Sequence, residues 1–265
     1  MTGVEGIHGL VANIHSYAQH MQAGVTYVGS QLTARMIRIR GKVCNNVVEN
    51  RIRLLEALSP LHTGELVLRR GDFARKIGCV VEQAPFFPIE NGWDFSILLL
   101  CPDPYWSAME ETRIEIAYWE PAFEWELDIP IETQDEGVVF GERTALNIIN
   151  VHDVGDIETG MRMSWRAIGT VVNPVLIKAQ NEDIFYKINT TMLAGDVIDI
   201  STDRRHLYAR LTRNGVTSNI MGLLDPKSTP DIQVQLRDNV LRFDADVGRT
   251  LVDVAIFYTR YYMGV

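Results

Sequence analysis

Short runs in which apolar and polar residues alternate dominate this chain and predict a mainly β protein. In residues 33–43, apolar residues alternate with basic ones, a period-two pattern that predicts a half-buried strand with a basic outer face. Residues 64–70 and 75–82 predict two further strands joined by a turn at Gly71-Asp72. The arginines assigned to the basic outer face are Arg35, Arg38 and Arg40.

One segment in the first half has the period of a helix. In residues 47–58, apolar side chains recur at intervals of three and four, with charged residues opposite. Ser59-Pro60 follows and predicts the end of this helix. The residues of the apolar face, which we expect to be buried, are Val48, Ile52, Leu55 and Leu58.

The most abrupt change of pattern follows residues 95–100, an apolar run that stops at Cys101-Pro102-Asp103-Pro104. Each proline lacks an N–H and restricts the residue before it, so neither a strand ladder nor a helix continues there. Tyr105 and Trp106 come next, and we expect such large aromatic side chains to pack against other side chains. We therefore predict a buried strand that ends in a rigid corner and closes a first β-rich unit.

The second half alternates short apolar runs with turn signals about every 8–12 residues, which is typical of an all-β sandwich. Asn214-Gly215 is the strongest short hairpin signal in the chain. By contrast, residues 1–30 are weakly patterned and predict loop and short strands, and residues 107–149 predict acidic strands. The strands predicted in the second half include residues 162–172, 184–189, 196–200, 206–213, 231–236, 239–244 and 251–258.

Composition places the chain among globular proteins, with 46% hydrophobic and 22% charged residues. No window approaches the ~20 uncharged apolar residues of a membrane helix, and residues 1–16 lack the pattern of a secretory signal. Cys44, Cys79 and Cys101 lie far apart without C-x-x-C spacing, which argues against a zinc site and a disulfide framework. We expect them to be small buried residues in a reducing compartment.

Charge is unevenly distributed around a net charge of −9. Residues 1–76 carry ten Lys or Arg and five Asp or Glu, whereas residues 77–145 carry two and fifteen. An acidic protein is a poor nucleic-acid binder, because phosphate contacts supply most of that affinity. The asymmetry favours self-association, with a basic face of one copy against an acidic face of a neighbour. Ordinary solvated surface is the alternative interpretation.

No catalytic, cofactor or metal site emerges from the motifs. The chain has no G-x-S-x-G elbow, phosphate-binding glycine loop or dinucleotide fingerprint, and its histidines are scattered without H-E-x-x-H spacing. Glu120, Glu124, Glu126 and Asp128 suggest a carboxylate pair for glycoside hydrolysis, but the last three alternate with apolar residues and better fit the wet face of a strand. The five tryptophans fit core or interface packing better than sugar stacking; they are Trp93, Trp106, Trp119, Trp125 and Trp165.

Several stretches, in order and spacing, resemble a known family. They are RMIRIRGKV, RLLEALSP followed by GELVL, APFFP, LLLCPDPYW, GDIETGMRMSWRAIGTVVNPVL, YKINTTMLAGDVIDI, LLDPKSTP and the ending IFYTRYYMGV. On these stretches the chain resembles the distal tail protein of long-tailed bacteriophages, the siphovirus tail component family, and the resemblance covers about residues 5–265. Family members usually carry a further opening segment of a few strands, so this resemblance implies an incomplete first domain or a late start codon.

The resemblance implies two β-sandwich-like domains. Residues 1–130 form an N-terminal ring-forming β domain with one helix, and residues 131–265 form a C-terminal galectin-like β-sandwich. In the family, six first domains form a ring around the tail axis that joins the tail tube to the hub carrying the tail-associated lysin or tip. Many such rings also anchor receptor-binding proteins. The implied location is the virion tail, assembled in the cytoplasm of the host bacterium.

The combined interpretation is a structural tail-tip protein without catalytic activity, cofactor, nucleic-acid partner or membrane partner. We expect Arg35, Arg38 and Arg40 to line a subunit interface or the ring lumen, so that charge reversal impairs assembly without unfolding the monomer. A carbohydrate-binding module that uses the C-terminal sandwich is the alternative. A glycosidase that uses Glu124 or Glu126 is the enzyme alternative.

Overall fold

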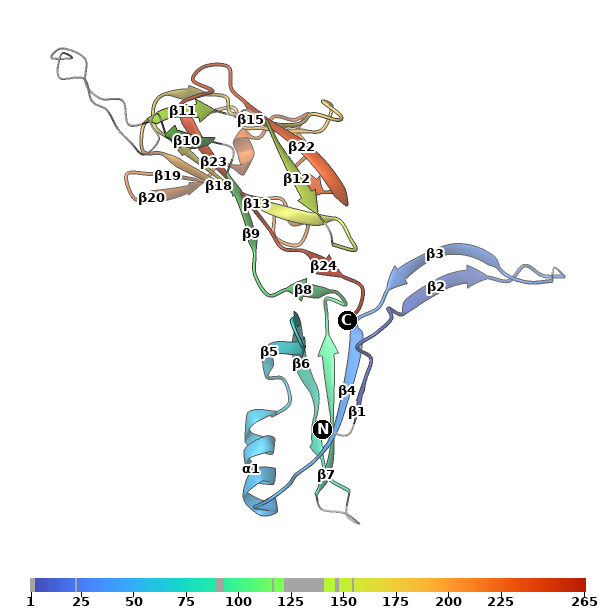
Figure 1. The fold of residues 1–265 in the computed structure, drawn as a ribbon. Helices are drawn as coiled ribbons and strands as arrows, with labels where there is room; N and C mark the ends of the chain where they lie inside the picture. The colour runs from blue at the N-terminus through green and yellow to red at the C-terminus, as the bar shows by residue number, and fades with distance from the viewer. Residues whose placement is uncertain are drawn as a thin grey trace. The chain divides into compact units, whose positions relative to one another are not determined.

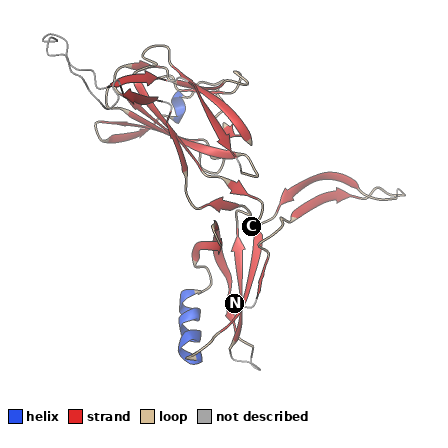
Figure 2. Ribbon diagram, in the orientation of Figure 1, coloured by secondary structure: helices blue, strands red, loops and turns tan. Residues whose placement is uncertain are grey.

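The structure is a computed structural model that describes residues 3–21, 23–88, 93–115, 117–121, 141–145, 148–153 and 155–265. It confirms the mainly β prediction (Figures 1 and 2). The chain divides into unit 1, Met1–Glu110 with Tyr261–Val265, and unit 2, Glu111–Arg260. The predicted boundary between residues 130 and 131 lies outside the described residues. None of the helices in the described ranges is both long and apolar enough to cross a membrane.

Unit 1 is built on a seven-stranded antiparallel sheet in the order β1-β4-β7-β6-β8-β24, with β5 paired to β6. The predicted hairpin is confirmed as β5–β6, with Arg70 opposite Phe73 and Gly71 at a φ of +60° in the turn. The strands of this sheet are β1 (Gly3–Glu5), β4 (Arg35–Lys42), β5 (Thr63–Arg70), β6 (Phe73–Phe86), β7 (Asp94–Cys101), β8 (Trp106–Ala108) and β24 (Tyr261–Tyr262).

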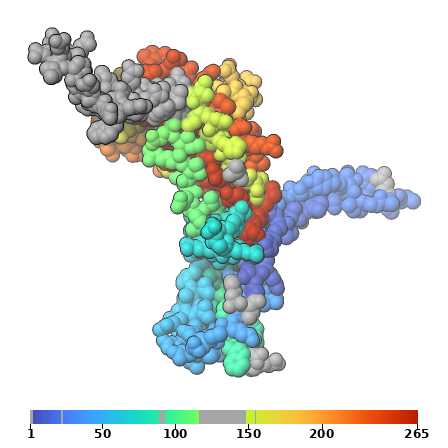
Figure 3. Space-filling model, in the orientation of Figure 1, coloured from blue at the N-terminus to red at the C-terminus, as the bar shows by residue number. Residues whose placement is uncertain are grey.

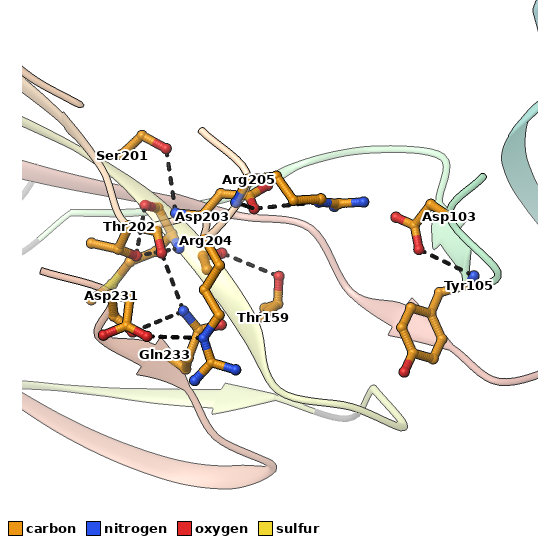
Figure 4. A network of polar contacts seen from close by, with 12 residues as sticks. Asp103, Tyr105, Thr159, Ser201, Thr202, Asp203, Arg204, Arg205, Asp231 and Gln233 are labelled. Atoms are coloured by element: carbon orange, nitrogen blue, oxygen red, sulfur yellow. Dashed lines mark hydrogen bonds and ion pairs between the residues drawn. The ribbon is translucent and has the colours of Figure 1, made fainter. Parts of the chain in front are cut away.

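The predicted corner separates two strands that both pair with β6. β7 pairs with Val80–Phe86, and β8 pairs with Arg75 and Lys76. Between them, an Asp103 carboxylate oxygen accepts a hydrogen bond from the Tyr105 N–H at 3.4 Å (Figure 4). Trp106 is fully buried, as predicted, and its indole N–H donates to the Ile7 carbonyl at 3.2 Å.

The predicted helix is present as α1 (Val47–Ala57), but the prediction that its Val48 face is buried is wrong. Val48, Ile52 and Leu55 are 75%, 52% and 42% exposed. Leu58, the last residue of the predicted face, is partly buried against the core of unit 1. Val47 and Leu54, which lie on a different side of the helix, are also less exposed. Two apolar stripes share the helix, and periodicity alone does not decide which one packs on the sheet.

The outer face predicted for β4 also needs correction. Arg35 is 5% exposed and shares the inner face with Ile37, whereas Met36 is 41% exposed beside Arg38. Because side chains alternate strictly along a strand, Arg35 cannot lie on the same face as Arg38 and Arg40.

The weakly patterned amino-terminal region contains a hairpin of its own. Strands β2 (Ala12–Tyr17) and β3 (Thr26–Leu32) pair with each other as a separate two-stranded sheet. This hairpin, with its turn, is called the arm below. Figure 3 shows it standing clear of the rest of unit 1.

Unit 2 contains two larger antiparallel sheets, β12-β22-β15-β16 and β20-β19-β18-β13-β23-β9, with β21 paired to β13. Two-stranded sheets β10–β11 and β14–β17 and the 3-10 helix η1 (Met221–Leu223) accompany them. The strands are β9 (Thr112–Glu115), β10 (Ala117–Pro121), β11 (Gly141–Ala145), β12 (Ile148–Asp153), β13 (Thr159–Ala167), β14 (Val171–Val172), β15 (Val175–Lys178), β16 (Phe185–Lys187), β17 (Thr191–Met192), β18 (Val197–Ser201), β19 (Tyr208–Arg213), β20 (Val216–Asn219), β21 (Gln233–Val234), β22 (Arg237–Asp244) and β23 (Val252–Tyr258).

The two larger sheets of unit 2 face each other across one core, as the sandwich prediction requires. Trp165 of β13 meets Phe243 of β22 edge-on at a centroid distance of 5.5 Å and Tyr186 of β16 at 6.4 Å. The hairpin signal is also confirmed, because Asn214 and Gly215 join β19 to β20 with φ values of +50° and +79°. The more specific galectin-like assignment stays a prediction.

Candidate functional site

Of the residues considered for catalysis or metal binding, the histidines lie in the described part of the chain and the acidic side chains do not. No group of three or more His, Cys, Asp or Glu side chains there is placed to hold a metal ion. Glu124, Glu126 and Asp128 lie outside the described residues, as does the Glu120 side chain. The histidines remain scattered between the units: His8, His15, His20 and His62 in unit 1, and His152 and His206 in unit 2.

The tryptophans have different environments. Trp106 and Trp165 are fully buried in the cores of units 1 and 2, which confirms core packing for these two. Trp93 is 52% exposed. Trp125 and the Trp119 side chain lie outside the described residues.

Unit 1 has a cleft of about 350 Å³ beside α1. Two of its lining residues are cations, and each has a carboxylate partner: Lys42 pairs with Asp94 at 3.7 Å and Arg53 with Glu49 at 2.6 Å. The lining residues are Lys42, Val43, Cys44, Asn50, Arg53, Leu54 and Phe95.

The buried Arg35 side chain forms several hydrogen bonds within unit 1. Its guanidinium donates to four main-chain carbonyls: Pro104 at 2.7 Å, Gly6 at 2.9 Å, His8 at 3.3 Å and Met263 at 2.6 Å. These carbonyls come from the amino-terminal segment, the proline corner and the carboxyl terminus. One side chain therefore joins three segments that are remote in sequence.

The proline corner explains why an arginine is needed at this position. Pro102 and Pro104 contribute no N–H, so the ladder between neighbouring strands is interrupted and carbonyls would be left without donors. The planar guanidinium of Arg35 carries five N–H donors, and one of them binds the Pro104 carbonyl at this corner. Burial lowers the pKa of Arg35, while the neighbouring Cys101 thiol acts in the opposite direction. Burial also raises the pKa of Cys101 to about 12, with Cys79 adding to the rise and Arg35 opposing it.

A second arginine holds the carboxyl terminus of the chain. Arg75 of β6 donates to the carbonyl of Gly264 and lies over the Tyr262 ring at 3.5 Å. Tyr261 and Tyr262 form β24 and pair with Ser107 and Trp106 of β8. The last five residues are therefore an integral part of unit 1.

Three surfaces of unit 1 expose groups of basic or apolar side chains. The outer face of β4 exposes Arg38 and Arg40, and Arg40 lies 3.2 Å from Glu5. The exposed apolar residues of α1 form a second surface, and the arm forms a third. Sequence periodicity placed Arg38 and Arg40 on the outer face correctly but Arg35 wrongly, and it assigned the apolar α1 stripe to the buried face. It predicted short strands in residues 1–30 but not their pairing into the arm.

Unit 2 contains well-satisfied polar groups beside its core (Figure 4). The Thr202 hydroxyl accepts from the Met161 N–H at 2.9 Å, and Gln233 donates to the Thr202 carbonyl at 3.2 Å. Elsewhere, the buried Asp196 accepts from Arg213 at 2.6 Å and from the Leu193 N–H at 2.7 Å. The Arg213 hydrogen bonds lower the pKa of Asp196, burial opposes them, and the Leu193 hydrogen bond lowers it further.

No protein-family model matches the chain, and no curated protein matches it either. Solved structures do match. The crystal structure of the SPP1 Dit (gp 19.1) protein, described as a paradigm of the hub adsorption apparatus in Gram-positive infecting phages, aligns with a TM-score of 0.67. The alignment covers 98% of this chain and 92% of that one, at 14% identity. This chain shares the fold of SPP1 Dit.

Two structures of the phage P2 baseplate in its activated conformation are also similar. The structure with Ca aligns with a TM-score of 0.53 at 11% identity, and the structure with Sr with 0.55 at 12%. Each alignment covers 99% of this chain and 90% of the other. The likeness therefore extends over both units, and at these identities it is a likeness of fold.

Proposed function

We propose that this chain is a structural component of a bacteriophage or prophage tail tip, a ring protein that joins the tail tube to the tip or baseplate hub. The observation that carries the proposal is the fold shared with SPP1 Dit over 98% of the chain, through both units. A common single domain would be weak support, because one fold hosts many functions. A two-unit arrangement matched from end to end is more specific.

The proposed partners are further copies of the chain in a hexameric ring, the tail tube protein, the tail-associated lysin or tip hub protein, and receptor-binding proteins. The proposed role is structural rather than catalytic, and the proposed location is the virion tail. A closed ring needs two different complementary surfaces on each subunit. Unit 1 offers a basic face at Arg38 and Arg40 and apolar surface on α1 and the arm.

Native mass spectrometry combined with negative-stain electron microscopy of the purified chain tests this proposal. Six copies of the 30.0 kDa chain give a particle of about 180 kDa, for which we expect a central hole. A monomer at every concentration tested would contradict the ring. If that monomer bound cell-wall polysaccharide saturably, the carbohydrate-binding alternative would replace it.

A further inference from the structure

The arm exposes an unusual amount of uncharged surface. All residues of β2 and all but one of β3 are exposed. No Lys, Arg, Asp or Glu occurs between Glu5 and Arg35. Edge strands that remain in water are normally protected by charged residues, especially lysine, and an isolated two-stranded hairpin is at best marginally stable. The arm lacks this protection, which indicates that another surface covers it.

Strand register gives the arm two faces of different composition: one, here called the apolar face, carries Ala12, Ile14, Tyr27 and Leu32 with Ser16 and Ser30, and the other is mainly polar. His15 pairs with Gly29 and Ser16 with Tyr27, so Val28 is an extra residue on β3. This bulge places Tyr27 on the same face as Ile14 and Leu32, and the Tyr27 hydroxyl lies 3.0 Å from the Ser30 hydroxyl on that face. The opposite face carries Asn13, His15, Tyr17, Thr26 and Gln31.

The apolar face has a counterpart elsewhere in unit 1. Val48, Ile52 and Leu55 recur at positions i, i+4 and i+7 of α1 and form an exposed ridge, here called the α1 stripe. The neighbouring charges Glu49 and Arg53 pair with each other at 2.6 Å, which leaves the stripe itself uncharged. The α1 stripe and the apolar face of the arm are therefore both uncharged and can pack against each other.

The two surfaces do not meet within one copy. In Figure 1, α1 lies on one side of the strands β4, β7 and β6, whereas the arm extends from the other side. A contact between them therefore requires two copies and uses a different surface on each. Contacts of this head-to-tail kind generate rings when the rotation closes.

We propose that the arm of one copy lies with its Ile14, Tyr27 and Leu32 face on the α1 stripe of the next copy in the ring. The inference rests on the proposed ring and specifies how its subunits hold each other. Burying this surface desolvates no formal charge on the arm, so apolar contact is gained without the cost of unpaired charges. The contact also covers the exposed apolar residues of α1.

Matched pairs of variants in the full chain test the contact by native mass spectrometry. Tyr27→Asp charges the apolar face of the arm, and Tyr17→Asp makes the same change on the polar face. Ile52→Lys charges the α1 stripe, and Ala57→Lys places the same side chain on the opposite, also exposed, side of α1. We expect Tyr27→Asp and Ile52→Lys to shift the particle from about 180 kDa to the 30.0 kDa monomer, while both controls keep the ring.

Cross-linking adds a direct test of proximity. In a Cys44→Ser background, which removes the exposed native thiol, Tyr27→Cys combined with Ile52→Cys should yield a ladder of covalent oligomers with a bis-maleimide reagent. Either cysteine alone should leave mainly monomer on a denaturing gel. All variants should keep the wild-type circular dichroism spectrum, since the changed side chains are exposed.

The outcomes separate this proposal from the proposed function. A wild-type chain that stays monomeric contradicts the ring and this contact together. A wild-type ring that survives Tyr27→Asp assigns the arm to another tail protein and overturns the contact while the ring stands. Loss of the ring with Tyr27→Asp but not with Ile52→Lys, or the absence of a ladder, overturns α1 as the docking surface.

Discussion

At the scale of single residues, Arg35 has a structural role that the surrounding sequence does not indicate. It stands next to Met36 in a basic strand and resembles Arg38 and Arg40, yet it is 5% exposed and the other two point outward. Its four acceptors are main-chain carbonyls of Gly6, His8, Pro104 and Met263. The charge reversal expected from sequence to affect assembly alone would, at Arg35, disrupt unit 1.

We expect Arg35→Ala to lower the free energy of unfolding of unit 1 by at least about 3 kcal/mol, since hydrogen bonds to charged groups contribute ~1.5–3 kcal/mol each and buried acceptors lose their donor. Arg35→Lys should recover only part of the loss, because an ammonium lacks the planar fork. Hydrogen exchange of the β7 and β8 peptides during urea titration reports on unit 1. Arg38→Ala, an exposed residue of the same strand, is the control. If β7 and β8 were equally protected from hydrogen exchange in Arg35→Ala and Arg38→Ala, the structural role of Arg35 would be contradicted.

The buried Asp196 makes the stability of unit 2 depend on pH. Its pKa is lowered in the folded state relative to the ordinary value of 3.8, chiefly by the Arg213 hydrogen bonds. The folded state therefore binds this proton more weakly than the unfolded state. The resulting stability is complete well above the unfolded pKa and is lost as pH falls through the folded pKa.

Asp196→Asn should remove this contribution. We expect the variant to be less stable at pH 7 by about 1–3 kcal/mol and to lose less stability than wild type between about pH 5 and pH 3. Urea unfolding followed by hydrogen exchange of β18 and β19 provides the measurement. Asp199→Asn, a change of the same kind on the same strand, is the comparison. Parallel pH profiles for wild type and Asp196→Asn would contradict the argument.

At the scale of elements, the sequence predicted those whose signals are local. Gly71-Asp72 and Asn214-Gly215 determine hairpins within a few residues, and the helical period of residues 47–58 determined the extent of α1. Faces were less predictable, because which side of an element is covered depends on segments far away in sequence. The α1 stripe and Arg35 were both misassigned for this reason.

Short strands were expected in residues 1–30, but their pairing into the arm was not predicted, and neither was β24. The two omissions have different physical reasons. In β3 the bulge at Val28 interrupts the period-two pattern, so Tyr27 and Leu32 do not read as one face of a regular strand. β24 has only two residues and pairs with β8, more than 150 residues earlier in the chain, through contacts that no local pattern encodes. Thus the basic part of the candidate assembly surface was predictable, and its apolar part was not.

Removing residues 261–265 tests the role of the carboxyl-terminal element. The truncation takes away the partner of β8 and the carbonyls of Met263 and Gly264 that Arg35 and Arg75 bind. We expect hydrogen exchange in β7 and β8 to become faster, about tenfold for each ~1.4 kcal/mol by which the free energy of opening falls. Exchange in β18 should be unchanged. Met263→Ala keeps the main-chain carbonyl and should behave as wild type. Equal effects on β8 and β18 would contradict a role confined to unit 1.

At the scale of the whole molecule, the chain passes between its two compact units twice, at Glu110-Glu111 and again at Arg260-Tyr261. A cut at residue 130 would therefore separate unit 1 from its own carboxyl-terminal strand. The uneven charge is a further property at this scale, with ten Lys or Arg against five Asp or Glu in residues 1–76. Within that basic stretch, Arg38 and Arg40 occupy the exposed face of β4. In the proposed ring, this face would contact a neighbouring subunit or line the lumen.

Reversing both charges, Arg38→Glu with Arg40→Glu, should impair assembly without unfolding the monomer. Like charges brought together at an interface cost several kcal/mol, whereas the Arg40–Glu5 pair is exposed and contributes only about 0–1 kcal/mol to the fold. We expect native mass spectrometry to show a smaller fraction of rings, and the loss to weaken at high salt because exposed charges are screened. Circular dichroism should remain that of wild type.

The control is Lys227→Glu with Arg249→Glu, which changes the net charge by the same amount at two exposed residues of unit 2. If both double variants lose rings equally, total charge rather than the β4 face controls assembly. If the β4 variant forms rings as wild type does, Arg38 and Arg40 face solvent in the ring, and the uncharged contact between the arm and the α1 stripe would then be sufficient to hold the subunits together. If only the β4 variant loses rings, an electrostatic contact of Arg38 and Arg40 acts together with the apolar contact between the arm and the α1 stripe.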